Sequence, residues 1–238
     1  MLRYSAGLIF LIFYVIWGAL LYPFYILSGK KTGKYLVRNL FIVVLKICGV
    51  KIVAEGLENV NENEIYLVVG NHQSVFDIPV IGAVLPLNLR IFAKKELSRI
   101  PVFGQLMVLY DFVFVNRNNQ REAVRDLKKA AQKMEHCSFL VFPEGTRSKD
   151  GRVGKFKSGA FSLAFETGKT ILPVALTGVA NIMRPGKLTV NKGTVYMKIF
   201  PPVKIEEGDS RKSVAEKLQL IISEYVHSKG GLNEKDQC

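Results

Sequence analysis

The chain has 238 residues, enough for one compact domain with a substantial core and an appendage. Hydrophobic residues make up 49% of it and charged residues 22%, with the apolar excess at the amino-terminal end, which excludes a polytopic membrane protein. The net charge of +13 favours anionic partners such as nucleic acid, phospholipid headgroups or a phosphorylated substrate. Cys48, Cys137 and Cys238 show no metal-ligand or disulfide spacing, which fits a reducing cytoplasmic setting.

The first predicted element is a membrane segment. Residues 4–28 carry no charge, and as a helix they would extend roughly 37 Å, against about 30 Å for the hydrocarbon core of a bilayer. A signal peptide is the alternative, but the run is long and no small-residue cleavage site follows it. A basic cluster within residues 30–38 opens a second apolar stretch and favours the cytoplasmic leaflet. We expect residues 1–50 to anchor the chain, either by crossing the bilayer or, because Pro23 interrupts the first helix, as a bent hairpin in one leaflet.

From residue 51 onward the pattern predicts an α/β domain. Short β-branched runs predict strands at residues 51–55, 64–70, 89–95, 111–117, 138–145, 170–178 and 194–202. Helical periodicity appears at residues 119–136, 156–168 and 210–228. Strands that alternate with helices indicate a mixed, largely parallel sheet flanked by helices. We expect this domain to cover residues 51–228 and a flexible tail to follow at residues 229–238.

The helix at residues 119–136 is strongly basic, which raises nucleic-acid binding as an alternative. The helix has no interleaved aromatic residues, and the chain has neither zinc-finger spacing nor an RNA-binding signature. A solvated helical face or a dock for an acidic partner is therefore the favoured interpretation, and we expect no nucleic-acid partner.

Polar motifs follow four of the predicted strands. They are NHQSVFD at residues 71–77, AKKEL at 93–97, VNRNN at 115–119 and PEGTRS at 143–148. Ligands of α/β sheets gather beyond the carboxyl ends of the strands. The four motifs therefore predict a single site, provided that their strands are neighbours in the sheet.

The NHQSVFD motif contains a candidate base and its orienting acid. Histidine accepts protons near neutral pH, and Asp77, in the first turn of a following helix, can hold His72 in the required tautomer. The structural alternatives are a plain loop histidine and a capping box formed by Ser74 and Asp77. The capping box uses the same turn, so it does not exclude the first interpretation. No nucleophile elbow is present, so such a base would activate a substrate hydroxyl or water directly.

Cations at the strand ends indicate a phosphate. Arg117 and Arg147 suit bidentate phosphate recognition, and Lys94 or Lys95 can add a point charge. Each of these residues taken alone can also be a simple surface charge. The chain has neither a Walker A motif nor a dinucleotide fingerprint, so a nucleotide-driven reaction is not expected.

In this order, NHQSVFD, VFVNRNN, FPEGTRS and ILPVALTG resemble the four motifs of the glycerolipid acyltransferase family. The likeness is greatest to its bacterial 1-acyl-sn-glycerol-3-phosphate acyltransferases, and it covers roughly residues 50–205. The resemblance implies that His72, held by Asp77, deprotonates the sn-2 hydroxyl of lysophosphatidic acid. The resulting oxygen would attack an acyl thioester without forming an acyl-enzyme, through a tetrahedral intermediate that needs an oxyanion hole.

The resemblance also implies roles for the other motif residues. Arg117 and Arg147 would hold the acceptor's phosphate with help from Lys94 or Lys95, and Glu144 and Gly145 would shape the same phosphate-binding pocket. An acyl site would be shaped by Leu172, Pro173 and Val174. No metal or bound cofactor is implied. EGTRS together with VNRNN favours a lysophospholipid acceptor over glycerol 3-phosphate.

The expected partners are lysophosphatidic acid, membrane phospholipids, and either acyl-CoA or acyl-carrier protein as the donor. The expected location is the cell membrane, with the catalytic domain on the cytoplasmic side. Two alternatives stay open at this point: an acyltransferase for another lysophospholipid, and a non-catalytic basic membrane protein that binds anionic ligands.

Overall fold

The computed structural model describes residues 35, 37–99, 104, 107–108, 112–115, 120–187 and 189–233. The apolar run at residues 4–28, Arg117 and the last residues of the chain lie outside this described part. Within it, none of the helices combines the length and the apolar character that are needed to cross a membrane.

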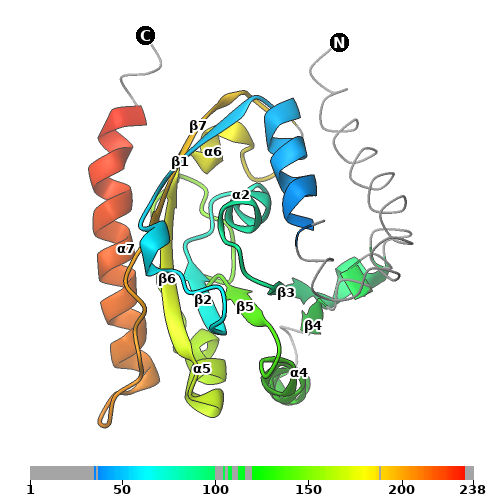
Figure 1. The fold of residues 1–238 in the computed structure, drawn as a ribbon, viewed down its shortest axis with the longest axis vertical. Coiled ribbons are helices and arrows are strands. Elements are labelled where there is room, and N and C mark those ends of the chain that lie inside the picture. Colours follow the sequence, from blue (N-terminus) through cyan, green and yellow to red (C-terminus); the bar gives the residue numbers. More distant parts are fainter. Residues whose placement is uncertain are drawn as a thin grey trace.

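In the described part of the chain, seven strands form one mixed sheet (Figure 1). They are β1 (Val50–Glu55), β2 (Tyr66–Gly70), β3 (Leu89–Lys94), β4 (Val113–Val115), β5 (Ser138–Val141), β6 (Thr170–Thr177) and β7 (Gly193–Ile199). The strand order is β1-β7-β6-β2-β5-β3-β4, and among the paired strands of the described residues only β6 and β7 run antiparallel. The mixed, largely parallel sheet predicted from the sequence is therefore confirmed.

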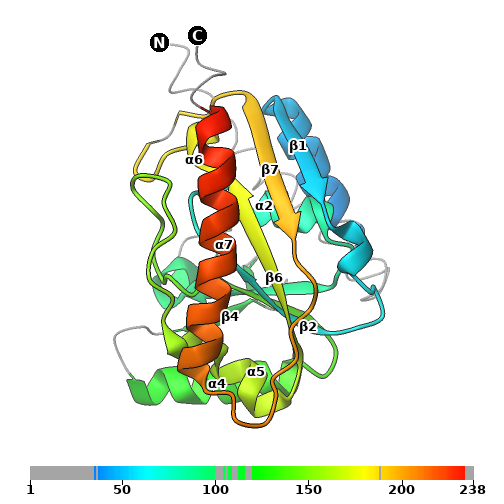
Figure 2. The ribbon, with the colours of Figure 1, turned by 90° about the vertical axis from the view of Figure 1, so that its left-hand side faces the viewer.

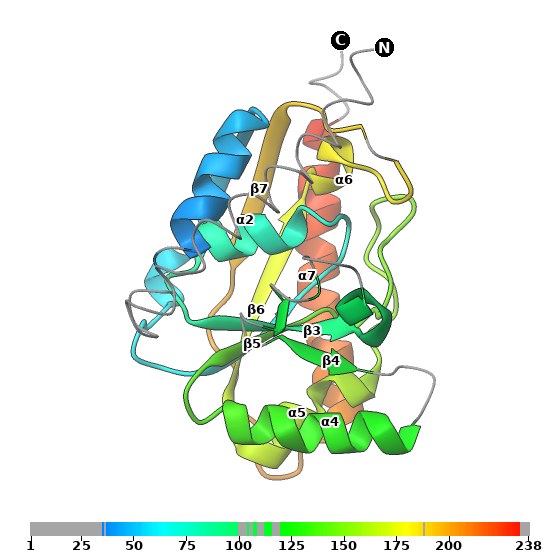
Figure 3. The same cartoon turned by 90° about the vertical axis from the view of Figure 1, so that its right-hand side faces the viewer.

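Helices cover both faces of this sheet, which gives three layers (Figures 1 and 2). One face carries a helix at residues 37–47 and α2 (Asp77–Val84), as Figure 3 shows. The other face packs against α4 (Gln120–Lys133), α5 (Ser162–Thr167) and α7 (Arg211–Asn233). Short connections contain η1 (Leu57–Asn59), η2 (Lys95–Arg99), η3 (Ser158–Phe161) and α6 (Val179–Ile182). Because β2 is covered on both faces, all five of its residues are buried and nearly all are apolar.

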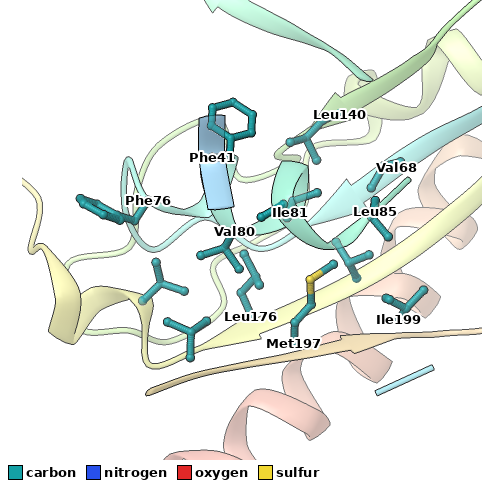
Figure 4. Packing of buried hydrophobic residues seen from close by; sticks show 14 of the residues in the cluster. Phe41, Val68, Phe76, Val80, Ile81, Leu85, Leu140, Leu176, Met197 and Ile199 are labelled. Carbon is teal, nitrogen blue, oxygen red and sulfur yellow. The ribbon is translucent and has the colours of Figure 1, made fainter. Parts of the chain in front are cut away.

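The core on the α2 side fixes that helix against the centre of the sheet. Val80 and Ile81 of α2 are fully buried in one cluster with Leu176 of β6 and Met197 of β7 (Figure 4). Burial of each such side chain contributes about 1.5–3 kcal/mol. The first residue of α2, Asp77, is thereby held at a fixed place beyond the end of β2.

The helix α7 continues past Ser228, where the sequence predicts the flexible tail to begin. Lys229 explains the extension, because its ammonium lies 3.5 Å from the Glu55 carboxylate and 5.6 Å from the ring centroid of Tyr196. These contacts fasten the last turns of the helix to β1 and β7. The helix ends at Asn233 despite two glycines in its last turns.

The helix at residues 37–47 packs onto the body of the protein, although the sequence groups it with the membrane anchor. Phe41 and Leu45 are buried in the same core cluster as α2. The Arg38 guanidinium donates a hydrogen bond from Nε to the Ala83 carbonyl oxygen, at 3.0 Å. This helix therefore packs directly against the helix that begins with Asp77.

Gly82 makes the close approach of these two helices possible. A Cβ added at this position would lie 2.5 Å from two ring carbons of Phe41. We therefore expect Gly82→Ala to lower the free energy of unfolding by about 1–3 kcal/mol, because the ring or the helix must move. This loss outweighs the gain of up to about 1 kcal/mol that alanine gives inside a helix.

Denaturant unfolding of the full chain in detergent micelles measures this effect. Gly159→Ala is the matched control, since a Cβ there meets no atom within 4 Å, and it should unfold like the wild type. Adding Phe41→Leu to Gly82→Ala should recover part of the stability. A Gly82→Ala variant as stable as the wild type would mean that the two helices do not pack in this way.

Candidate active site

The site is built on the turn between β2 and α2, which Asn71 anchors to the sheet. Its side-chain amide donates to the Leu176 carbonyl and its Oδ1 accepts from the Leu176 N–H, both at 2.8 Å. Asn71 is almost fully buried, so this pair of bonds fixes the residue next to His72. Sequence reasoning gave Asn71 no role, although a polar residue directly after a buried strand is a usable signal.

His72 and Asp77 are in direct contact. The Nδ1 atom of His72 lies 2.6 Å from Oδ2 of Asp77, which is fully buried at the first position of α2. The same Oδ2 accepts the backbone N–H groups of Gln73 at 2.7 Å and Ser74 at 2.9 Å. The bond from Ser74 has the form of one half of the expected capping box, but α2 begins at Asp77, and its N-cap, Phe76, makes no side-chain cap hydrogen bond. Asp77 therefore holds the turn and orients the histidine with the same oxygen. With Nδ1–H donated to Asp77, Nε2 is the ring nitrogen that can take a proton.

The charge state of Asp77 depends on this set of donors. Burial raises the pKa of Asp77, because its carboxylate has lost water, and the hydrogen bond from His72 and the two backbone N–H groups oppose that rise. Its second oxygen, Oδ1, is buried and accepts no hydrogen bond within the described residues. The ionised form of Asp77 therefore depends on the hydrogen bond from His72 Nδ1–H and on the two backbone N–H groups.

Phe142 fixes the face of the imidazole. The two rings are stacked with centroids 4.1 Å apart and an interplanar angle of 11°. Asp77 at one edge and Phe142 on one face leave the His72 side chain 19% exposed. Sequence reasoning missed Phe142, and the only sequence signal for it was an aromatic residue at the end of a predicted strand.

Glu144 joins the loop after β5 to this turn. Its Oε1 accepts the His72 N–H at 2.8 Å and its Oε2 accepts the Gly154 N–H at 3.0 Å. Only 8% of the residue is exposed, and burial raises the pKa of Glu144 while the two N–H groups act against that. Gly145, with φ of 75°, then turns the chain so that the Ser148 N–H reaches the His72 carbonyl at 2.7 Å. Glu144 and Gly145 thus shape the loop.

The cations of the predicted phosphate pocket follow neighbouring strands. Arg147 is exposed on the loop after β5. Lys94 ends β3, and Lys95 is exposed at the start of η2. Because β2, β5, β3 and β4 are adjacent and parallel, their carboxyl ends lie at one edge of the sheet. The strand adjacency that the sequence argument requires is therefore present, although Arg117 lies outside the described residues.

The remaining predicted positions lie away from the surface. Leu172, Pro173 and Val174 are buried in β6, where they pair with Val68, Val69 and Gly70 of β2. They support the strand that leads directly into the turn of His72.

The arrangement can perform base catalysis. The cysteine Cys137 does not belong to this site, because it immediately precedes β5 and so lies at the edge of the sheet opposite His72. Within the described residues, no cluster of three or more His, Cys, Asp or Glu side chains is arranged to hold a metal. The chemistry that the described side chains support is proton abstraction from a substrate, next to a loop that carries a cation.

Comparisons with known proteins show which family this chain resembles. Residues 51–177 match the model of the family described as Acyltransferase. A 1-acyl-sn-glycerol-3-phosphate acyltransferase of Cocos nucifera is 34% identical over 202 residues, which cover 84% of this chain and 62% of that protein. The enzyme of the same name from Borreliella burgdorferi is 31% identical over 171 residues, which cover 71% of this chain and 68% of that protein. This chain thus spans about three-fifths of the plant relative.

A solved structure shares the fold over almost its whole length. The crystal structure of the 1-acyl-sn-glycerophosphate (LPA) acyltransferase PlsC from Thermotoga maritima has a TM-score of 0.84 and 27% sequence identity. The match covers 95% of this chain and 94% of that protein.

Proposed function

This chain belongs to the acyltransferase family, and from that premise we propose that it transfers a fatty acyl group from a thioester to the sn-2 hydroxyl of lysophosphatidic acid. The product is phosphatidic acid. The observation that carries the proposal is the 2.6 Å contact between His72 and Asp77, which leaves the other ring nitrogen as the proton acceptor. The names of the sequence relatives and of the solved structure support the same acceptor.

The proposed reaction needs no protein nucleophile. Nε2 of His72 takes the proton of the acceptor hydroxyl as its oxygen attacks the thioester carbonyl carbon. Asp77 retains the hydrogen bond from Nδ1–H and stabilises the imidazolium that forms. When the tetrahedral intermediate collapses, the carbon–sulfur bond breaks and the leaving thiolate takes the proton from Nε2. The net change is one ester formed and one thioester cleaved, with His72 returned to its starting state.

We assign recognition of the acceptor's phosphate to Arg147 and Arg117, with Lys94 or Lys95 assisting. Guanidinium groups bind phosphate oxygens in pairs, whereas a carboxylate repels them. We therefore give Glu144 a role in holding the loop, because both of its oxygens already accept backbone N–H groups.

We also place the enzyme at the cell membrane with the α/β domain on the cytoplasmic side. The uncharged run at residues 4–28 and the basic cluster that follows support this placement. Leu172, Pro173 and Val174 would act on the acyl site from within β6, through the end of β2. The donor is acyl-CoA or acyl-carrier protein.

Release of free thiol tests the proposed reaction. The purified full chain in detergent is mixed with long-chain acyl-CoA, with and without lysophosphatidate, and then with acyl-carrier protein as the donor. We expect release that depends on lysophosphatidate with at least one donor. A folded protein that releases no thiol with either donor would refute the proposal. Equal rates with lysophosphatidylcholine would show that the phosphomonoester is not recognised.

Arg147→Ala should weaken binding of the acceptor. Loss of hydrogen bonds between charged groups costs about 1.5–3 kcal/mol, so kcat/KM for lysophosphatidate should fall about 10- to 100-fold, mainly through KM. Steady-state kinetics with varied acceptor measure the change. Arg152→Ala is the matched control, because that side chain lies on the same loop and is 89% exposed. Arg147 has no phosphate-binding role if both variants behave alike.

A further inference from the structure

The turn of His72 and the loop after β5 form one hydrogen-bonded unit. Glu144 bonds the His72 N–H at 2.8 Å and the Gly154 N–H at 3.0 Å, which fixes both ends of the loop. Between them, the Ser148 N–H donates to the His72 carbonyl at 2.7 Å. Arg147 lies within this loop. Hydrogen bonds therefore connect the loop that carries the proposed phosphate-binding residue to the turn that carries the base, His72.

Gln73 is the side chain that makes this connection in the middle of the loop. Its Nε2 donates to the Gly151 carbonyl at 2.8 Å, and its backbone N–H donates to Oδ2 of Asp77 at 2.7 Å. One residue therefore contacts both the acid that orients His72 and the loop that carries Arg147.

Burial of this amide leaves only one of its two polar atoms with a hydrogen bond among the described residues. Gln73 is 2% exposed, and its Oε1 is buried without a hydrogen-bond partner among the described residues. An unpaired buried acceptor destabilises a protein, whereas an apolar side chain of the same length would not carry that cost. The bond to Gly151 is what an apolar side chain would lose.

Further hydrogen bonds connect the residues of the loop between Arg147 and Gly151. Asp150 Oδ1 accepts the Ser148 hydroxyl at 3.0 Å and the Arg152 N–H at 3.1 Å. This local ring of bonds holds the backbone between Arg147 and Gly151 in one shape. These bonds and the bond from Gln73 to Gly151 form a continuous connection between the backbone next to Arg147 and Gln73.

We propose that Gln73 is a positioning residue that couples recognition of the acceptor's phosphate to alignment of the His72–Asp77 pair. This proposal depends on the proposed function, because it requires a phosphorylated acceptor. Phosphate binding at Arg147 holds the loop in place, and Gln73 passes that restraint to Asp77 and thus to the imidazole. Binding energy from the remote phosphate is then used at the reacting hydroxyl.

The test compares two acceptors in the wild type and in Gln73→Met, which keeps the length of the side chain and removes the amide. Lysophosphatidate carries the phosphate and 1-monoacylglycerol lacks it. We expect Gln73→Met to lower kcat for lysophosphatidate about 10- to 100-fold, as loss of alignment does, with KM kept because Arg147 is intact. The slower reaction of 1-monoacylglycerol should change less than about twofold, because no phosphate restraint is used there.

Addition of inorganic phosphite to the 1-monoacylglycerol reaction gives a second readout. Phosphite should accelerate the wild type and leave Gln73→Met unchanged. Circular dichroism and thermal unfolding check that the variant is folded. If it is not, Asp150→Ala, whose side chain is 66% exposed, replaces it with the same expected loss of phosphite activation.

The outcomes separate the two proposals. A wild type that does not acylate lysophosphatidate refutes the proposed function itself. A wild type that does, together with a folded variant that slows both acceptors equally or retains phosphite activation, refutes the coupling role and leaves the proposed function standing.

Discussion

Replacement of His72 by alanine should lower turnover of lysophosphatidate ~10²- to 10⁴-fold, the range that general-base catalysis supplies. The acceptor's KM should change little, because the phosphate-binding residues are intact. The measurement is thiol release at saturating donor and acceptor, with folding checked by circular dichroism, since the ring also stacks on Phe142.

His227→Ala is the matched control for this prediction, because His227 is exposed on α7, across the sheet from His72. It should keep wild-type turnover. A His72→Ala variant that is folded and retains turnover within about threefold of the wild type would remove His72 from the reaction, because so small a loss falls below the range for a general base.

Asp77→Asn should have an effect of similar size. With the amide oxygen in the place of Oδ2, it can still accept the N–H groups of Gln73 and Ser74 and the Nδ1–H of His72, so the turn should keep its shape. A neutral amide, however, does not stabilise the imidazolium that forms on His72 as the carboxylate does. An equivalent change in the triad of a serine protease lowers turnover ~10⁴-fold, and thiol release measures the loss here.

The same variant, although less active, should lose less stability than the wild type as the pH rises. Burial raises the pKa of Asp77 in the folded state, so the folded protein binds the proton more tightly than the unfolded chain does. The stability that this proton contributes is complete below about pH 4, near the pKa of an aspartate in an unfolded chain. It is lost as the pH rises through the pKa of Asp77 in the folded protein. An asparagine side chain cannot ionise, so this loss should be absent from Asp77→Asn.

Thermal unfolding of both proteins across this pH range tests the argument. The melting temperature of the wild type should fall relative to that of the variant as the pH rises from about 4 towards neutrality. A difference that grows in the other direction would mean that His72 and the two N–H groups outweigh burial and hold the pKa of Asp77 below its ordinary value.

Local patterns in the sequence were enough to predict the strands of this fold. Runs such as residues 67–70 and 139–141 are apolar throughout and lead to polar motifs, which is typical of buried parallel strands. Strand order could not be predicted, because nothing in one parallel strand specifies its neighbour. The helix α2 shows no amphipathic period, since most of its residues are buried. Only the position of Asp77 at its start was predictable.

In the site, too, local features could be predicted from the sequence and long-range ones could not. Contacts within one motif, such as that between His72 and Asp77, follow from spacing and turn chemistry. Contacts that span long separations in sequence do not, and the bonds of Glu144 to His72 and of Gln73 to Gly151 are of this kind. The sequence predicted that Glu144 shapes the phosphate-binding pocket, but it did not indicate which backbone N–H groups its two oxygens accept.

The short helix α2 has a consequence for how the enzyme would meet a lipid surface. It begins with Asp77, and near its other end the Ala83 carbonyl accepts the bond from Arg38. Eight residues of helix are a rigid spacer about 12 Å long. Under the proposed attachment through the amino-terminal segment, we expect this spacer to contribute to the distance between the imidazole and the leaflet. Acceptors would then be sorted by the depth at which they present their hydroxyl, in addition to the contacts that they make.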